Sequence, residues 1–202
     1  MTQLTDLQAT VYTITNRPEL VSETLVAIKK ATLKAHNSET YARDLVEVSV
    51  TGASLVSVSS SDFRYQIAIG SSPISRFRRI AYLREIPTAT GPYGLVKQYR
   101  FLEADSIFDS YNVEHTDYAY LAGATINLRT QVLTTGVKVG YYQYPDVTDA
   151  GFNSWIADLY PAAITDDAAA TVFKMIGKDD EETRYRQLAA ENYHILQAMN
   201  IY

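Results

Sequence analysis

The fold is decided by residues 152–202, which read FNSWIADLYPAAITDDAAATVFKMIGKDDEETRYRQLAAENYHILQAMNIY. Trp155 and Leu159 share a helical face, and Pro161 then starts or kinks a second helical segment because proline lacks the backbone donor of a helix interior. An apolar stripe continues to Gly177, a natural helix stop. Its members are Ile164, Ala168, Val172 and Met175. The many small residues suit close helix packing.

A last helix is predicted after the acidic turn 179–182. Asp179 with Glu182 three residues later resembles a capping box in which Asp replaces Ser. The buried side of this helix is expected at Tyr185, Leu188, Ala189, Leu196 and Met199.

The first forty residues also predict helices. Leu4, Leu7, Val11 and Ile14 recur at spacings of three and four. Asn16 and Pro18 indicate the start of a second helix, because Asn caps free N–H groups and Pro is tolerated in a first turn. The stripe of that helix is Val21, Leu25, Ile28, Thr32 and Ala35.

Between these ends the hydrophobic period changes to two, which is typical of half-buried strands. Segments 46–50 and 63–69 alternate cleanly, and 76–86 alternates with a phase slip that predicts a bulge near Arg78 and Arg79. Segments 124–128 and 137–141 predict a hairpin across Thr134–Gly136.

The expected fold class is therefore α+β, with N- and C-terminal helices forming a helical bundle and a β-rich insertion between them. We expect a single chain unit, 1–202, with a helical lobe of residues 1–43 plus 145–202 and a β-rich insertion of residues 44–144.

Composition agrees with a globular protein and excludes several classes. Hydrophobic residues make up 47% and charged residues 20%, and the net charge of -5 argues against general nucleic-acid binding. The absence of cysteine excludes disulfides and thiolate metal sites. No apolar run reaches the roughly 20 residues of a membrane span, and residues 1–6 lack the pattern of a signal peptide. Tyrosine is abundant, at 16 residues, and suits strand faces and half-wet interfaces.

The chain offers no recognisable catalytic motif: GxGxxG, GxxxxGK, GxSxG and HExxH are all absent. We therefore expect no enzyme activity, no cofactor and no metal. His36 lies near a helix C-terminus, where it could cap carbonyls, and His194 is expected at the surface or an interface. His115, between Glu114 and Thr116, is better explained by a polar loop than by a metal site. The acidic pairs, including Asp166 and Asp167, are better explained by helix dipoles than by acid–base catalysis.

A basic cluster with interleaved aromatic residues stands out in the middle of the chain. Its members are Arg76, Arg78, Arg79, Arg84, Lys97 and Arg100. Ordinary outward charge on strands is the favoured interpretation, contact with a partner comes second, and duplex-specific recognition comes last.

Two regions together resemble the head-to-tail adaptor proteins of tailed bacteriophages, especially short-tailed ones. One is 15–20, TNRPEL, with 31–36, ATLKAH, and 41–45, YARDL. The other is Trp155, Tyr160–Pro161, the alanines 168–170, Phe173, Met175 and the acidic turn before the closing helix. Together these regions cover roughly half of the chain.

The resemblance implies a structural virion protein at the head–tail junction, made in the host bacterial cytoplasm. Copies would form a ring, usually of twelve, beneath the portal protein and would join capsid to tail. The ring would extend the channel through which phage DNA passes without specific binding. Tail nozzle or fibre proteins would dock on the ring. No membrane partner is implied. The candidate contacts with the portal or another partner are Met199, Ile201, Tyr202, Arg76, Arg78 and Arg79.

Two alternatives stay open. A β-rich module of a tail tip could bind carbohydrate or another receptor, with tyrosines stacking on sugars. A virion-associated hydrolase could use scattered carboxylates as general acid and base. Long helical termini favour the adaptor, because neither alternative needs them.

Overall fold

The computed structural model describes residues 3–61, 63–86, 97–103 and 117–199. The chain divides into two compact units. Met1–Asp44 and Tyr144–Tyr202 form a helical unit, and Leu45–Gln143 forms a β unit. Each unit has a hydrophobic core of its own.

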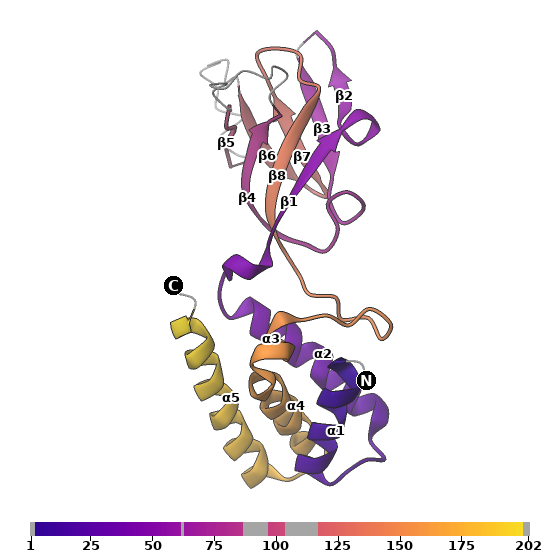
Figure 1. Ribbon diagram of the computed structural model, residues 1–202, viewed down its shortest axis with the longest axis vertical. Helices are drawn as coiled ribbons and strands as arrows, with labels where there is room; N and C mark the ends of the chain where they lie inside the picture. The colour runs from indigo at the N-terminus through magenta and orange to yellow at the C-terminus, as the bar shows by residue number, and fades with distance from the viewer. Residues whose placement is uncertain (1–2, 62, 87–96, 104–116, 200–202) are drawn as a thin grey trace. The chain divides into compact units, whose positions relative to one another are not determined.

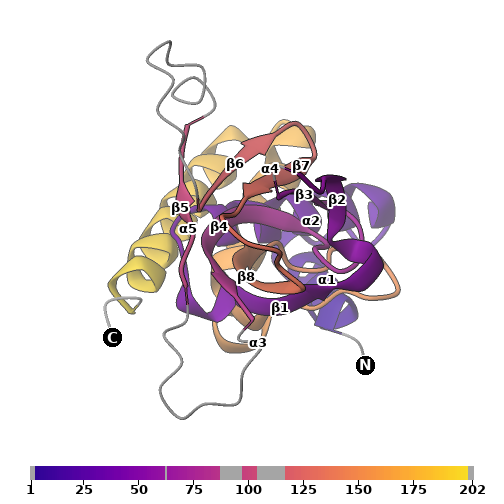
Figure 2. The ribbon, with the colours of Figure 1, turned by 90° about the horizontal axis from the view of Figure 1, so that it is seen from above.

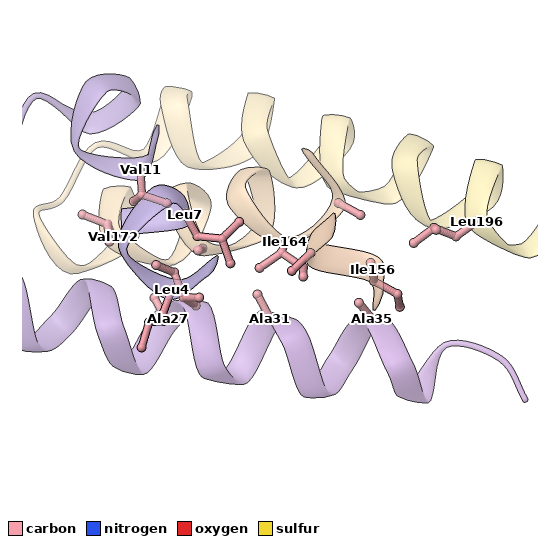
Figure 3. Close-up of a cluster of buried hydrophobic side chains, with 14 of the residues drawn as sticks. Leu4, Leu7, Val11, Ala27, Ala31, Ala35, Ile156, Ile164, Val172 and Leu196 are labelled. Atoms are coloured by element: carbon pink, nitrogen blue, oxygen red, sulfur yellow. The ribbon is translucent and has the colours of Figure 1, made fainter. Parts of the chain in front are cut away.

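The helical unit contains the five α-helices of the described residues (Figure 1). They are α1 (Gln3–Thr15), α2 (Val21–Asn37), α3 (Trp155–Leu159), α4 (Pro161–Met175) and α5 (Asp179–Met199), with a short 3-10 turn, η1, at Ala42–Asp44. Figure 3 shows side chains from all five helices directed into one interior, among them Leu7, Ala31, Ile156, Ile164 and Leu196. The two ends of the chain therefore build one core.

Helix α4 is the centre of this unit, since it contacts each of the other four helices. Its buried face is largely alanine, at 163, 168, 169 and 170, and the exposed fraction of each is at most 1%. A methyl group is the smallest side chain that still buries apolar surface, so neighbouring helices approach α4 closely. The predicted role of the small residues in close packing is confirmed.

Two of the predicted helix boundaries are wrong. Asn16 does not cap α2; it has a φ of +52°, its N–H donates to the Tyr12 carbonyl, and it ends α1. Leu20 holds the N-cap position of α2, and its side chain accepts no hydrogen bond from the first turn of the helix. Asp179 is the first residue of α5 and not the residue before it, so Asp179 does not hold the N-cap position that the predicted capping box requires.

The predicted stop at Gly177 is confirmed. Its φ is +73°, a conformation that favours glycine. The N–H of Lys178 donates to the Phe173 carbonyl and that of Gly177 to the Lys174 carbonyl, which is a Schellman arrangement. The turn reverses the chain so that α5 runs back along α4 (Figure 1).

The β unit holds the eight strands of the described residues, in two sheets. The three-stranded sheet has the order β1 (Leu45–Thr51), β8 (Gly136–Gln143), β4 (Phe77–Glu85). The five-stranded sheet has the order β2 (Val56–Ser59), β3 (Arg64–Ala68), β7 (Thr125–Arg129), β6 (Tyr118–Ala122), β5 (Arg100–Phe101). Figure 2 shows β1, β8 and β4 side by side in one layer. Buried residues of both sheets form one core, with Ile67 and Ile126 from one sheet and Leu83 and Val139 from the other.

The predicted strands at 46–50 and 63–69 are confirmed in place and in the alternation of burial. The bulge near Arg78 is confirmed by a register shift between Phe77 and Arg79, and a second shift lies between Ile80 and Tyr82. The hairpin across Thr134–Gly136 is wrong. Strand β7 pairs with β3 and β6, and β8 pairs with β1 and β4, so the two strands meet only as side chains in the shared core.

Both sheets are tied to each other at their edges. On one side the chain leaves β1 through the 3-10 turn η2 (Gly52–Ser54) and enters β2 at the edge of the other sheet. On the other side the Tyr99 N–H donates to the Leu83 carbonyl of β4, and the next residue begins β5. Edge strands present unpaired backbone groups, so these ties leave less open edge.

The expected fold class, a bundle of terminal helices with a β-rich insertion, is contradicted. The described chain is α+β with five α-helices and eight strands, but the strands are divided between two sheets around a core that is separate from the helical core. Helices lie at both ends, and α3, α4 and α5 follow the sheets in sequence. The description of a bundle plus an insertion therefore fits only in part. The alternation of apolar residues in the sequence predicts strands, but it does not predict which sheet each strand joins.

A first prediction concerns Gly140, which lies in register between Glu47 and Tyr82. A Cβ at this position would lie 2.4 Å from the Tyr82 ring. We expect Gly140→Ala to destabilise the protein by about 1–3 kcal/mol, because the ring must move. Urea unfolding of the single and double variants checks this. In a Tyr82→Ala background the same glycine change should cost much less, and an equal cost in both backgrounds would contradict the explanation.

Candidate functional site

One connected group of polar side chains in the helical unit has the order Ser–His–Asp. His36, in the last turn of α2, has its Nε2 2.9 Å from Ser154 Oγ. Its Nδ1 lies 3.0 Å from both carboxylate oxygens of Asp44. The three residues come from α2, from η1 and from the residue before α3. This arrangement has the connectivity of a catalytic triad.

Trp155 completes the group. Its indole N–H donates to Asp44 Oδ1 at 2.8 Å, and its ring meets those of His36 and Tyr41 edge to face, with centroids 5.8 and 5.1 Å apart. The guanidinium of Arg43 lies over the same ring, 5.4 Å from its centroid. Asp44 thus accepts hydrogen bonds from two aromatic side chains, those of His36 and Trp155.

The triad is structural, because no substrate can reach its serine. The exposed fractions of Ser154, His36 and Asp44 are 2%, 1% and 6%. Ser154 is also the N-cap of α3, and its Oγ accepts the Ala157 N–H at 3.2 Å. A nucleophilic serine needs an open face and donors aimed at a developing oxyanion. Here the hydroxyl instead satisfies a helix end and a buried imidazole, which is the usual role of a fully bonded buried polar group. The prediction that His36 caps the carbonyls at the end of α2 is wrong, because its two ring nitrogens bond the side chains of Asp44 and Ser154.

A second polar cluster holds three helices together around Asp167 of α4. This carboxylate is buried, with Lys34 Nζ of α2 at 2.8 Å and Arg186 Nη1 of α5 at 2.6 Å. Its neighbour Asp166 accepts from the Asn192 amide at 2.9 Å, and burial raises the pKa of Asp166. Both acids lie beyond the first turn of α4. The helix dipole therefore does not explain them, and partners on neighbouring helices do.

A third cluster lies on the three-stranded sheet around Glu47 of β1. The carboxylate accepts from Tyr82 Oη at 2.6 Å and from the guanidinium of Arg84, both on β4, and from Lys138 Nζ of β8 at 3.0 Å. The hydrogen bond from Tyr82, followed by that from Lys138, lowers the pKa of Glu47 from 4.5 to about 2. One acidic side chain thus joins all three strands of the sheet.

The basic cluster predicted from the sequence is divided by the structure. Arg84 is paired with Glu47, and Lys97 with Asp117 at 2.5 Å. Arg76 precedes β4 with a φ of +48° and bonds the Gln143 side chain at 3.3 Å, whereas Arg78 and Arg79 lie at the bulge of β4. Arg100 lies on β5, in the other sheet. For Arg84 and Lys97 the favoured interpretation, strand charges with local partners, is the one that the contacts support.

The remaining candidates are placed as follows. Met199 is the last residue of α5, and Ile201 and Tyr202 lie outside the described residues, as do Glu114 and His115. His194 is exposed on α5, as expected. Within the described part of the chain, no three His, Asp or Glu side chains gather in a way that could hold a metal ion.

Sequence reasoning missed the triad and the Glu47 cluster. Ser154 stands directly before the helical stripe of Trp155, so its role as a cap could have been found from the usual N-cap preference. His36 and Ser154 are 118 residues apart, and no local pattern links them.

A second prediction tests the structural role of the triad. Ser154→Ala removes a helix cap and a partner of His36, and we expect a loss of about 1–3 kcal/mol in the free energy of unfolding. Ser22→Ala, at an exposed serine of α2, is the matched control and should be near neutral. A fluorophosphonate probe should not label the folded protein. Labelling at Ser154 that disappears in His36→Ala would instead reveal a nucleophile.

A third prediction concerns pH. Because folding lowers the pKa of Glu47, its carboxylate stabilises the folded state above the ordinary value of 4.5, and this contribution is lost as the pH falls toward about 2. Urea midpoints of the wild type and Glu47→Gln should therefore differ clearly at pH 7 and converge near pH 2. A difference that does not change with pH would contradict the assignment.

Comparison with known proteins adds no family. No protein-family model matches the chain, and the search of curated proteins found no match. Among the helices that the structure describes, none combines the length and hydropathy that a membrane crossing requires.

Proposed function

We propose that this chain is a structural subunit of a bacteriophage head-to-tail adaptor. Copies form a ring beneath the portal protein, join capsid to tail, and extend the channel through which the genome passes. Tail nozzle or fibre proteins dock on the ring. The proposal rests on the resemblance of the helical segments 15–45 and 155–182 and on one feature of α5.

That feature is a continuous exposed stripe along α5. The helix has 21 residues, yet the described buried side chains on it are only Ala189 and Leu196, of which Leu196 belongs to the helical core. The exposed residues recur at spacings of three and four and so lie on one face. They are Asp180, Thr183, Arg184, Gln187, Ala190, Glu191, His194, Ile195 and Ala198.

The composition of this stripe favours another protein surface as its partner. It combines small side chains at 190 and 198 with an apolar one, Ile195, whose exposed fraction is 51%. Both signs of charge are present, with Arg184 and Glu191 seven residues, or about two helical turns, apart. Small residues allow close helix approach, and mixed charges give register to a contact between unlike surfaces. Such a heterologous contact between identical copies closes into a ring when the rotation fits.

Other surface features of the helical unit agree with this role. Exposed large apolar side chains also occur on the other helices: Val21, Val26, Leu159 and Met175. The candidates for contact with the portal or another partner remain Met199, Ile201 and Tyr202 near the C-terminal end of α5, Arg76 directly before β4, and Arg78 and Arg79 on β4. The burial of Ser154 argues against a hydrolase with a serine nucleophile, since this serine serves as a helix cap.

A fourth prediction tests the adaptor directly. Purified protein is mixed with candidate portal rings, and the products are examined by native mass measurement and electron microscopy. We expect stoichiometric decoration of one end of the portal. Ala190→Arg should reduce the assembled fraction at least tenfold, because it places a long charged side chain in the stripe of α5, while the thermal midpoint of the free subunit stays unchanged.

The matched control is Ala9→Arg, the same substitution at an exposed alanine of α1. It should assemble like the wild type. If both variants assemble equally well, the stripe of α5 is not part of the interface. A wild-type protein that decorates no portal and forms a small stable oligomer by itself would overturn the proposed function.

A further inference from the structure

The outer face of the five-stranded sheet carries a cavity of about 360 Å³ that the adaptor role does not use. It lies over β2, β3, β7 and β6, and six of its side chains form two rows across the sheet. In one row Arg64, Arg129 and Tyr118 are in register; in the other, Gln66, Asn127 and Tyr120. The residues between the rows, Tyr65 and Leu128, belong to the core. The alternation of strands therefore directs a polar and aromatic set away from the core.

The amide row is already ordered for hydrogen bonding. Gln66 Nε2 donates to Asn127 Oδ1 at 2.9 Å, and Asn127 Nδ2 donates to Thr125 Oγ1 at 3.2 Å. Each amide nitrogen has two hydrogens, and each of these bonds uses one. The second hydrogen of each is available to an acceptor in the cavity, so the pair presents fixed donors side by side.

The arginine row favours an anion. Arg64 and Arg129 are directly opposite each other on neighbouring strands, and both line the cavity, so this end of it carries positive charge. No carboxylate lines the cavity among the residues that the structure describes. In that same part of the chain, Arg129 forms no ion pair. A guanidinium binds a planar carboxylate through two parallel hydrogen bonds.

The aromatic pair supplies an apolar wall. The rings of Tyr118 and Tyr120 are 26° from parallel, with centroids 6.3 Å apart. Tyr118 is almost covered, with an exposed fraction of 8%, so Tyr120, which is half-buried, offers the accessible ring. An aromatic face beside convergent polar groups is typical of a small-molecule site, and the volume lies near the lower end of the usual range of roughly 300–1,000 Å³. A helix or a duplex would need a longer surface.

We propose that this cavity binds a carboxylated sugar of a polysaccharide. The pyranose ring stacks on Tyr120, Arg129 binds the carboxylate, and the amides of Gln66 and Asn127 donate to ring hydroxyls or to the glycosidic oxygen. The binding needs only the β unit's own residues and does not depend on a ring of subunits. It gives the chain a contact with acidic glycans such as those that coat bacterial cells.

The fifth prediction is tested by calorimetric titration of the intact chain. The probes are oligosaccharides of galacturonate, glucuronate and sialate, each with its methyl ester as the neutral counterpart. We expect saturable binding of at least one acidic probe, and at least tenfold weaker binding of its ester. Arg129→Gln and Tyr120→Ala should each weaken binding at least tenfold, and Arg129→Lys should restore part of it, since charge remains without the planar fork.

Matched controls on the other sheet are Arg79→Gln, at an exposed arginine, and Tyr142→Ala, at a half-buried tyrosine, and both should bind like the wild type. Thermal midpoints identify any variant that fails to fold, and Arg129→Gln, which keeps a long polar side chain, decides the result if Tyr120→Ala does not fold.

Absence of binding to every acidic probe overturns the proposal, as do equal affinities for acid and ester. It is also overturned if the cavity variants change the oligomeric mass, because a neighbouring copy then covers this face. Portal decoration by Tyr120→Ala and Arg129→Gln should be unchanged. The experiments therefore test the adaptor function and the glycan site independently.

Discussion

The structure of the helical unit depends on one buried imidazole. His36 receives or donates a hydrogen bond at each ring nitrogen, and the two partners, Asp44 and Ser154, belong to the last segment before the β unit and to the first helix start after it. A buried polar group that loses its partner costs about 1–3 kcal/mol, so removal of one member of this group destabilises the others. The group therefore joins the two halves of the helical unit at the points where the chain leaves and returns.

Local pattern was enough to predict most elements, because helix and strand periods are properties of a few neighbouring residues. The stripe around Val11, the alternation around Val48 and the stop at Gly177 all appear in the structure. Pairing was not predictable in the same way. Segments 124–128 and 137–141 have matching alternation, yet they join different sheets, since the choice between pairing partners depends on the packing of all eight described strands.

The polar clusters show the same limit. The sequence contains each member of the groups around His36, Asp167 and Glu47, but only Asp44 lies within 10 residues of its partner His36, and Lys34 and Asp167 are 133 residues apart. From the sequence, Asp166 and Asp167 are predicted to interact with a helix dipole. In the structure both carboxylates instead contact side chains of α5. The two tyrosines of the cavity, at 118 and 120, could be assigned to one strand face from their spacing. Their alignment with Arg129 and Asn127 depends on the register between β6 and β7.

The division of the helical unit between the two ends of the chain sets an order for its synthesis. Helices α1 and α2 leave the ribosome more than a hundred residues before α4, the helix on which they pack. At 5–20 residues per second, this interval is about 6–25 s. The β unit, whose residues are contiguous, is complete before α4 exists, so it is able to fold while α1 and α2 still expose their apolar stripes. Those stripes are the part of the newly made chain that a chaperone would need to cover.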